Sequence, residues 1–201
     1  MGNKIRLVMF GRQGAGKGTQ CLRIAEHFGV VHFSTGDALR AAVAAGSELG
    51  QEIGEVIERG QLVDDALMIR LVIERLNQDD IVENGCVLDG FPRTITQSEA
   101  LLAAFNSGEV AGGQLDCVVH LEVPLEEVTA RMKQRGRKDD TDEGIASRLA
   151  FHDRETVPVL DWFEAQGLLV TVDGLGTEAE VTKRLIQSLE LATAFQAENR
   201  G

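Results

Sequence analysis

A glycine-rich segment near the N-terminus constrains this chain more than any other feature. Residues 11–19 read Gly-Arg-Gln-Gly-Ala-Gly-Lys-Gly-Thr and directly follow the apolar run Leu7–Phe10. Residues 21–28 then place apolar side chains at helical spacing. A buried strand, a glycine loop and a helix N-terminus together bind phosphate through converging backbone N–H groups. This context favours a phosphate-binding loop, with Lys17 reaching the outer phosphates, over a flexible glycine turn that carries a surface lysine.

The loop departs from the general phosphate-binding pattern at one position. That pattern has Ser or Thr directly after the lysine, whereas Gly18 separates Lys17 from Thr19 here. Thr19 is therefore a weaker candidate ligand for Mg²⁺ than the general motif implies.

Composition and charge limit the partners of the chain. Its 201 residues suffice for one good core, and 43% hydrophobic with 26% charged residues is typical of a globular protein. The net charge of −12 argues against nucleic acid or an acidic membrane as partner, because no global positive field attracts them. A polyphosphate ligand must therefore be held by a local cluster of basic residues.

The cysteines indicate a reducing compartment. Cys21, Cys86 and Cys117 are odd in number, far apart and in no Cys-x-x-Cys pair, so we expect neither a disulfide framework nor a zinc knuckle. The expected location is the cytoplasm. No apolar stretch approaches the roughly 18 residues of a membrane span, and we expect no signal peptide before the first strand.

Strand and helix patterns alternate along the chain. Apolar runs predict strands at residues 7–10, 30–33, 86–88, 117–123 and 168–172. Helices are predicted at residues 21–28, 35–45, 49–59, 65–76, 94–105, 124–135 and 142–162, and from residue 177 onward. Pro158 is expected to kink the long seventh helix. The alternation predicts an α/β protein with a parallel sheet covered on both faces, and the stretch from Ser34 to Val63, which lacks a strand pattern, predicts a helical insertion.

Four motifs in order resemble the adenylate kinase family of nucleoside monophosphate kinases. The resemblance runs from about Ile5 to Leu189, and its motifs are Gly14–Gln20, Ser34–Asp37, Leu88–Arg93 and Arg135–Asp140. It implies a parallel sheet flanked by helices, of the P-loop NTPase type, with a helical AMP-binding insertion and a short lid. It also implies a monomer that transfers phosphate from MgATP to AMP, giving two ADP.

The resemblance implies one kinase domain over residues 1–201. Its core comprises residues 1–33, 64–133 and 141–201, the nucleoside monophosphate-binding insertion residues 34–63, and the lid residues 134–140. Because the lid contains no cysteine, we expect no zinc, and Mg²⁺ bound with ATP is the expected cofactor.

The family's functional positions map onto specific residues here. The ATP-binding positions are Gly14, Ala15, Gly16, Lys17, Gly18, Thr19, Arg135 and Gly176. The AMP-binding positions are Thr35, Arg40, Gln61, Leu62, Val63, Gly90, Phe91, Pro92, Arg93, Gln97, Arg137 and Arg148. The catalytic positions are Lys17, Arg93, Arg135, Arg137 and Arg148, and Asp89 holds Mg²⁺ through water.

The chemistry of the implied reaction agrees with this residue set. The acceptor is a phosphate whose second pKa is about 6, so it is already a nucleophile at neutral pH. Catalysis then needs alignment and positive charge rather than a side-chain base. We therefore expect structural roles for His27, His32 and His120.

Several residues have a second interpretation. Thr35 fits a helix-cap residue, and Thr94 and Gln97 fit a helix capping box. Asp89 fits a turn with Gly90, and Arg131 fits a solvated helix residue. Two alternative functions are a UMP/CMP kinase and a non-catalytic nucleotide sensor. UMP/CMP kinases usually have other residues at the positions of Thr35, Thr94 and Gln97. A non-catalytic nucleotide sensor would have no reason to keep both an AMP pocket and the lid arginines.

Two departures from the family pattern concern rigidity. Arg12-Gln13 stands where the family usually has two prolines in the loop, so we expect a less rigid loop with one more positive charge. Asp64-Asp65 replaces the usual proline at the exit of the insertion, which we expect to loosen that hinge.

Overall fold

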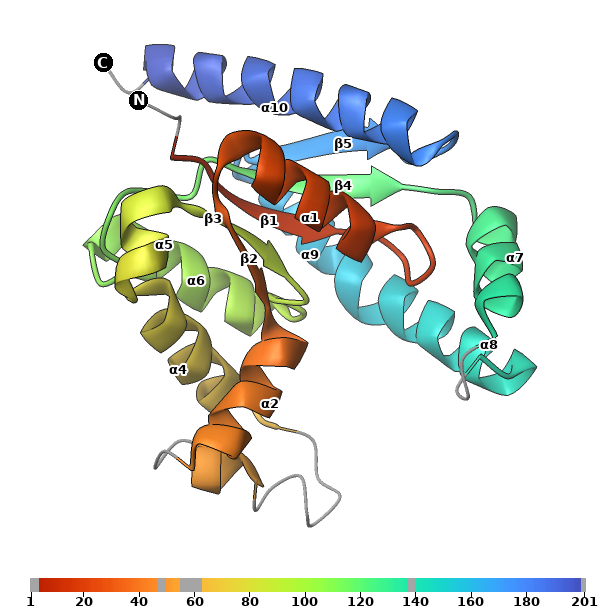
Figure 1. Ribbon diagram of the computed structural model, residues 1–201, viewed down its shortest axis with the longest axis horizontal. Helices are drawn as coiled ribbons and strands as arrows, with labels where there is room; N and C mark the ends of the chain where they lie inside the picture. The colour runs from red at the N-terminus through yellow and green to blue at the C-terminus, as the bar shows by residue number, and fades with distance from the viewer. Residues whose placement is uncertain (1–3, 47–49, 55–62, 137–139, 200–201) are drawn as a thin grey trace.

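The computed structural model describes residues 4–46, 50–54, 63–136 and 140–199, and a parallel sheet lies at its centre (Figure 1). In this part of the chain the sheet has five strands, in the order β2-β3-β1-β4-β5. They are β1 (Arg6–Phe10), β2 (Val31–Ser34), β3 (Cys86–Asp89), β4 (Cys117–Glu122) and β5 (Leu169–Asp173). Every pair is parallel. The predicted α/β class is confirmed.

Helices connect the strands and cover both faces. They are α1 (Lys17–Phe28), α2 (Thr35–Ala45), α4 (Asp65–Leu76), α5 (Asp79–Asn84), α6 (Ile95–Ser107), α7 (Leu125–Arg135), α8 (Asp142–Phe151), α9 (Val157–Ala165) and α10 (Glu178–Asn199). Residues 50–54 are also helical, whereas the rest of the helix predicted over 49–59 lies outside the described residues. The short α5 has no counterpart among the predicted helices.

Side-chain alternation along β1 divides the core into two layers. Leu7 and Met9 pack with α1 and α10 on one face of the sheet. Val8 and Phe10 pack with α4, α6 and α9 on the other. Successive strand residues point to opposite faces, so a strand buried on both sides is apolar throughout.

Two helix starts follow from local sequence. Asp64 caps α4 by accepting a hydrogen bond of 2.8 Å from the backbone N–H of Leu67. Thr177 and Glu180 exchange hydrogen bonds of 2.8 and 3.3 Å between the backbone N–H of each and the side chain of the other, which forms a capping box at the start of α10.

The prediction of one uninterrupted helix over residues 142–162 is wrong. The π-helical segment η1 (His152–Thr156) separates α8 from α9 and ends two residues before Pro158. Proline has no N–H to donate and its ring crowds the carbonyl group four residues earlier, so the wider π turn relieves that crowding. Similarly, Pro124 is the N-cap of α7 and not its first helical residue.

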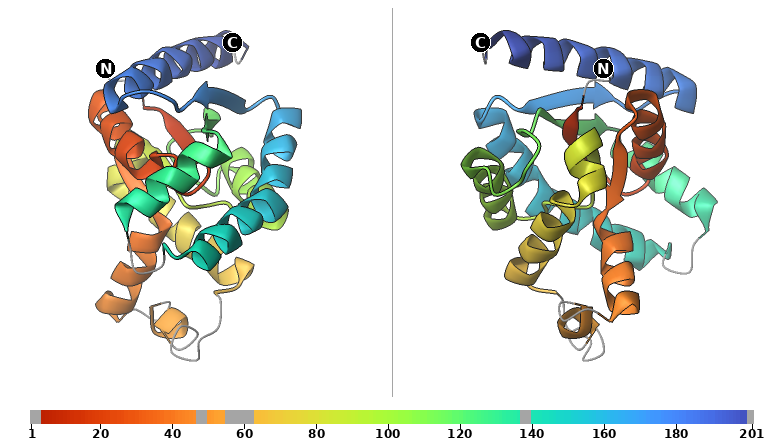
Figure 2. Two further views of the ribbon diagram at one scale, coloured as in Figure 1. Left: turned by 90° about the vertical axis from the view of Figure 1, so that its right-hand side faces the viewer. Right: turned by 60° about the vertical axis from the view of Figure 1, so that its left-hand side comes forward.

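Two groups of helices extend beyond the sheet. In Figures 1 and 2, α2 and residues 50–54 project from one side of the sheet, while α7 and α8 lie near its carboxyl edge. A small apolar cluster of Ile53, Leu67 and Leu71 joins residues 50–54 to α4. None of the helices in the described residues combines the length and apolar composition that a bilayer crossing requires.

Candidate active site

Strand register brings three loops to one point at the carboxyl edge of the sheet. Asp89, the last residue of β3, is paired with Met9 of β1 and with Ser34 of β2. The chain leaves β1 for α1 on one face, and leaves β3 for α6 on the opposite face. The crevice between two such strands is the usual ligand site of an open α/β sheet.

The glycine loop after β1 forms an anion-binding cradle. Gly14 and Gly16 have φ of +89° and +96°, a region that L side chains avoid. A Cβ atom on Gly14 would also lie 2.8 Å from the carbonyl oxygen of Val128. Gly16 is the N-cap of α1 and offers no side-chain acceptor, so N–H groups of the first turn remain available to an anion.

The side chain of Lys17 curls back over this loop. Its Nζ donates hydrogen bonds to the carbonyl oxygens of Gly11 and Arg12 at 2.7 and 3.2 Å. Burial lowers the pKa of the Lys17 ammonium, and the nearby carboxylate of Asp89 opposes that shift. Phosphate oxygens are stronger acceptors than carbonyl groups for this cation, because the hydrogen bond then joins two charged groups.

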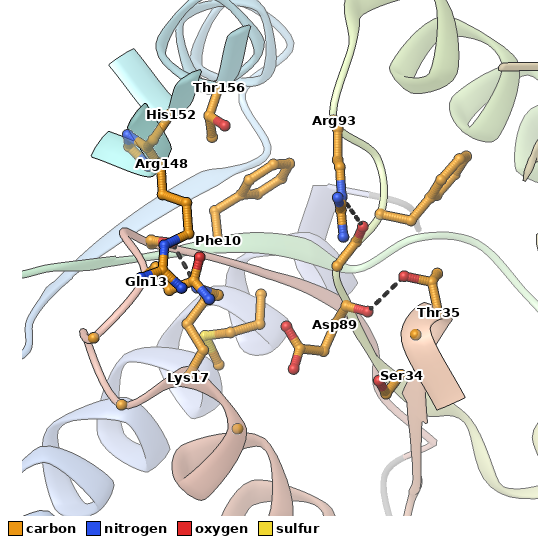
Figure 3. Close-up of a pocket in the computed structure, with 18 of the residues that line it drawn as sticks. Phe10, Gln13, Lys17, Ser34, Thr35, Asp89, Arg93, Arg148, His152 and Thr156 are labelled. Carbon is orange, nitrogen blue, oxygen red and sulfur yellow. Dashed lines mark hydrogen bonds between the residues drawn. The ribbon is translucent and has the colours of Figure 1, made fainter. Parts of the chain in front are cut away.

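A cavity of about 850 Å³ lies at this crevice (Figure 3). Most of the predicted site residues line it, from both proposed nucleotide sites: Gly14, Gly16, Lys17, Gly18, Thr19, Thr35, Asp89, Gly90, Phe91, Pro92, Arg93, Arg135 and Arg148. The tertiary structure therefore brings together residues that are up to 134 positions apart in the sequence (from Gly14 to Arg148).

Arginines from three elements contribute positive charge to the cavity. Arg93 donates from Nε to the carbonyl oxygen of Gly90 at 2.8 Å. Arg135 and Arg148 both bind the fully buried carboxylate of Asp140, at 2.8 and 2.7 Å. Arg131 also lines the cavity and contacts the carbonyl oxygen of Ala15 at 3.4 Å. Its shortest contact is the i,i+4 ion pair with Glu127 at 2.7 Å, which is typical of a solvated helix residue.

Thr35 and Gly90 show how closely β2 and β3 approach at the cavity. Thr35 is 1% exposed, and its hydroxyl donates to the carbonyl oxygen of Asp89 at 3.3 Å. Gly90 has φ of +89°, and a Cβ atom there would lie 2.7 Å from Thr35 Oγ1. A side chain at position 90 would therefore force these two loops apart.

Gln97 is buried beside the cavity and does not line it. Its Oε1 accepts from the backbone N–H of Arg93 at 2.7 Å, and its Nε2 donates to Asp65 at 2.6 Å. Thr94 caps α6 by accepting from the Gln97 N–H at 3.2 Å, so the capping interpretation of Thr94 is confirmed. Asp65, at the exit of the proposed insertion, thus fixes the orientation of the amide.

The remaining predicted residues lie elsewhere. Ala15 is buried beneath the loop, Val63 packs beside α4, and Gly176 lies in the turn after β5, away from the cavity lining. Gln61, Leu62 and Arg137 fall outside the described residues, and Arg40 belongs to α2 but its side chain is likewise not described.

Cavity residues that the sequence did not single out include His152 and Thr156 of η1. His152 follows Arg148 by four residues, and Thr156 follows it by eight. Helical spacing of i, i+4 and i+8 places all three on one face, which is the signal that would have identified them.

One carboxylate in this cavity suits a magnesium ion. Mg²⁺ usually binds proteins through one or two carboxylates and completes its shell with water and substrate phosphates. The Asp89 side chain is 19% exposed, lines the cavity and faces the glycine loop, so it fits that role (Figure 3).

Comparisons with known proteins agree with this geometry. The family model described as "Adenylate kinase" matches residues 9–168. The adenylate kinase of Phenylobacterium zucineum is 42% identical over 94% of this chain and 100% of its own length. The adenylate kinase of Xanthomonas campestris is 43% identical over 92% of this chain and 99% of its own length. That of Caulobacter vibrioides is 41% identical over 94% of this chain and 100% of its own length. The chain therefore belongs to the adenylate kinase family.

Proposed function

We propose that this enzyme transfers the γ-phosphoryl group of MgATP to AMP, reversibly, to give two molecules of ADP. One observation carries the proposal: a single cavity combines a phosphate cradle containing Lys17 with a second basic wall at Arg93. Arg135 and Arg148 reach the same cavity from α7 and α8. Two phosphate-binding walls that face each other suit a donor and an acceptor that are both nucleotides.

The residues of the cavity act by alignment and charge neutralisation. The glycine loop and Lys17 hold the donor phosphates, Arg93 holds the acceptor phosphate, and Arg135 and Arg148 stabilise charge on the group in transfer. Mg²⁺ bound with ATP would be held by Asp89 through water and would supply further positive charge. Because the acceptor phosphate is itself the nucleophile, none of the histidines needs to act as a base.

Two segments are proposed to close over the nucleotides. They are the AMP-binding insertion over residues 34–63 and the short lid over residues 134–140, with the core formed by the rest of the chain. The apolar cluster that joins residues 50–54 to α4 is small, and Arg135 of the lid shares the carboxylate of Asp140 with Arg148 of α8, which supports this division. Closure excludes water, so phosphate passes to AMP rather than to solvent.

We propose that the enzyme acts as a cytoplasmic monomer on small nucleotides without a zinc ion or a nucleic-acid partner. The three cysteines are buried and unpaired, as expected in a reducing compartment. The net charge of −12 disfavours polyanionic partners.

The closest rival activity is that of a UMP/CMP kinase. Gln97 does not line the cavity in this structure, but its amide retains one N–H and one oxygen lone pair beyond its bonds to Asp65 and Arg93. We propose that closure of the insertion brings these groups against the edge of adenine, which favours a purine acceptor. The deciding experiment is a coupled assay of ADP formation from ATP with AMP, CMP or UMP. We expect AMP to be preferred by at least about 100-fold in kcat/KM, since sites that hydrogen-bond a substrate group reject analogues strongly. Equal rates with CMP would favour the rival.

A further inference from the structure

Three potential metal ligands meet on one side of the sheet, next to the cavity. They are the thiol of Cys21, the imidazole of His32 and the carboxylate of Asp89, whose ligand atoms all lie within 4.8 Å of one another. They come from α1, β2 and β3, and the proposed phosphoryl transfer gives no role to the first two.

The fold explains why these side chains converge. β2 and β3 are parallel, with Ser34 opposite Asp89, so His32, two residues earlier on β2, shares a face with Asp89. Val87 of β3 lies on the same face and packs in one apolar cluster with residues of α1, so α1 covers that face. Cys21 lies one helical turn after Lys17 on α1, and therefore lies over the same strand ends.

The imidazole of His32 has an unsatisfied nitrogen that points into this cluster. Its Nε2 is buried and has no hydrogen-bond partner among the described residues. It lies 3.9 Å from Asp89 Oδ2, which is too far for a hydrogen bond. A buried polar atom without a partner is unfavourable, and a cation between the imidazole and the carboxylate would satisfy both.

We propose that Cys21, His32 and Asp89 form a binding site for a borderline or soft divalent cation such as Zn²⁺ or Cd²⁺. Thiolate, imidazole and carboxylate are the protein ligands of zinc, whereas Mg²⁺ prefers oxygen alone. Zinc bonds of about 2.0–2.3 Å require ligand atoms closer together than 4.8 Å, so the three groups move inward by roughly 1 Å. Water completes the coordination shell.

The protonated thiol of Cys21 and the ammonium of Lys17 both oppose metal binding, so we expect the site to be occupied only when metal is added to the solution. The thiol of Cys21 is fully buried and must lose its proton to the solvent when the metal–sulfur bond forms. Burial raises the pKa of this thiol, and the ammonium of Lys17 lies close enough to Asp89 to repel a second cation. This site therefore differs from a resident structural zinc, which we do not expect.

Occupation of the site would have a consequence for catalysis. Asp89 is also the residue proposed to hold Mg²⁺ through water, so a cation on Cys21 and His32 withdraws it from that role. Inhibition by Zn²⁺ is expected, and this part of the inference rests on the proposed function.

The direct test is spectroscopic and does not depend on activity. Chelator-dialysed protein is titrated with Cd²⁺, and the ultraviolet absorption of the cadmium–thiolate bond is recorded. The wild type and the matched Cys117→Ala variant, which changes another fully buried cysteine, should show the band at one equivalent. Cys21→Ala should lose it, and His32→Gln should weaken cadmium affinity by at least about tenfold, because loss of even an outer-shell partner of a ligand has an effect of this size.

A second arm connects binding to catalysis. Zn²⁺ should inhibit ADP formation by the wild type and by Cys117→Ala at concentrations about tenfold lower than those that inhibit Cys21→Ala. Circular dichroism confirms that each variant is folded. A band that persists in Cys21→Ala, or that is absent from the wild type, overturns the proposed site. If the wild type forms no ADP, the proposed function is contradicted. The cadmium titration still tests the metal site in that case.

Discussion

The guanidinium of Arg12 lies 2.9 Å from the carboxylate of Asp153, and this ion pair joins the glycine loop after β1 to the π-helical segment η1. Asp153 also contacts the ring of its neighbour His152 at 3.2 Å. At position 12 the family pattern usually has proline. The ion pair therefore restrains the glycine loop from outside and connects it to the segment after Arg148, at the position where the sequence led us to expect a less rigid loop.

We predict that Arg12→Ala and Asp153→Asn each raise the KM for ATP a few-fold while the protein remains folded. The Asp153 side chain is 49% exposed, so a double-mutant cycle of urea unfolding should give a coupling of about 0.2–1 kcal/mol. The hydrogen bond from Arg12 lowers the pKa of Asp153, so this coupling is present at neutral pH and is lost in acid, as pH falls through the lowered pKa. Arg154→Ala serves as the control, because Arg154 also belongs to η1 but its described contacts are with the neighbouring Glu155 and the ring of Phe151, and not with the glycine loop. An unchanged KM in both loop variants would contradict the restraint.

Lys17→Met is expected to leave a folded protein whose turnover is lower by about 10²–10³-fold or more. Its ammonium is the cation at the mouth of the cradle, and loss of one preorganised donor to transition-state charge has an effect of this size. Circular dichroism and ADP formation are measured together. Lys183→Met, which changes an exposed lysine of α10, should retain the wild-type rate. A folded Lys17→Met with most of its activity would show that the loop assignment is wrong.

Asp140→Asn should lower kcat by about tenfold or more with a smaller change in KM. Its buried carboxylate binds both Arg135 and Arg148, so the variant loses charge-assisted hydrogen bonds that position the two guanidinium groups. Steady-state kinetics with both substrates separates the two parameters. The control is Asp142→Asn, whose exposed carboxylate pairs with Lys133. Equal kinetics for the two variants would argue against a positioning role for Asp140.

Gln97→Ala is predicted to erode much of the preference for AMP over CMP. The amide is held between Asp65 and the Arg93 N–H, with one N–H and one lone pair remaining for adenine. In the closed site an acceptor that cannot pair with these leaves them unsatisfied, at about 1–3 kcal/mol. Asp65→Ala should reduce the preference as well, because the amide then loses its orientation. The ratio of kcat/KM for AMP and CMP is the measurement, and Gln187→Ala on the exposed side of α10 is the control. An unchanged ratio in Gln97→Ala would remove this residue from acceptor recognition.

The free energy of unfolding should fall as pH is lowered from about 7 to 5. Burial lowers the pKa of His152 and of His120, although the hydrogen bond to Asp153 opposes the shift at His152 and Glu122 opposes it at His120. Below the ordinary histidine pKa of about 6.5, the unfolded chain therefore binds protons that the folded protein resists, so stability rises with pH in this window. Urea unfolding at several pH values measures the slope. His152→Gln should flatten it and His27→Gln, at an exposed position, should not; a slope unaffected by His152→Gln would exclude this residue as its source.

Local sequence determined the elements and the chemistry of the loop. Gly14 and Gly16, the cap at Asp64 and the capping box at Thr177 each work through neighbours within a few residues, so their spacing identifies them. Hydrophobic periodicity likewise located the strands, because a strand buried on both faces must be apolar throughout. The resemblance to the family added functional roles for residues such as Arg93 and Arg148, which no local pattern provides.

Only the tertiary structure decided which distant side chains meet. The pairing of Ser34 with Asp89 sets Thr35 against Gly90 and brings His32 and Cys21 to the same carboxylate. The contacts of Arg12 with Asp153 and of Gln97 with Asp65 join residues that are 141 and 32 positions apart. Such contacts depend on strand register and helix packing, which the whole chain sets together, so no short stretch of sequence can specify them.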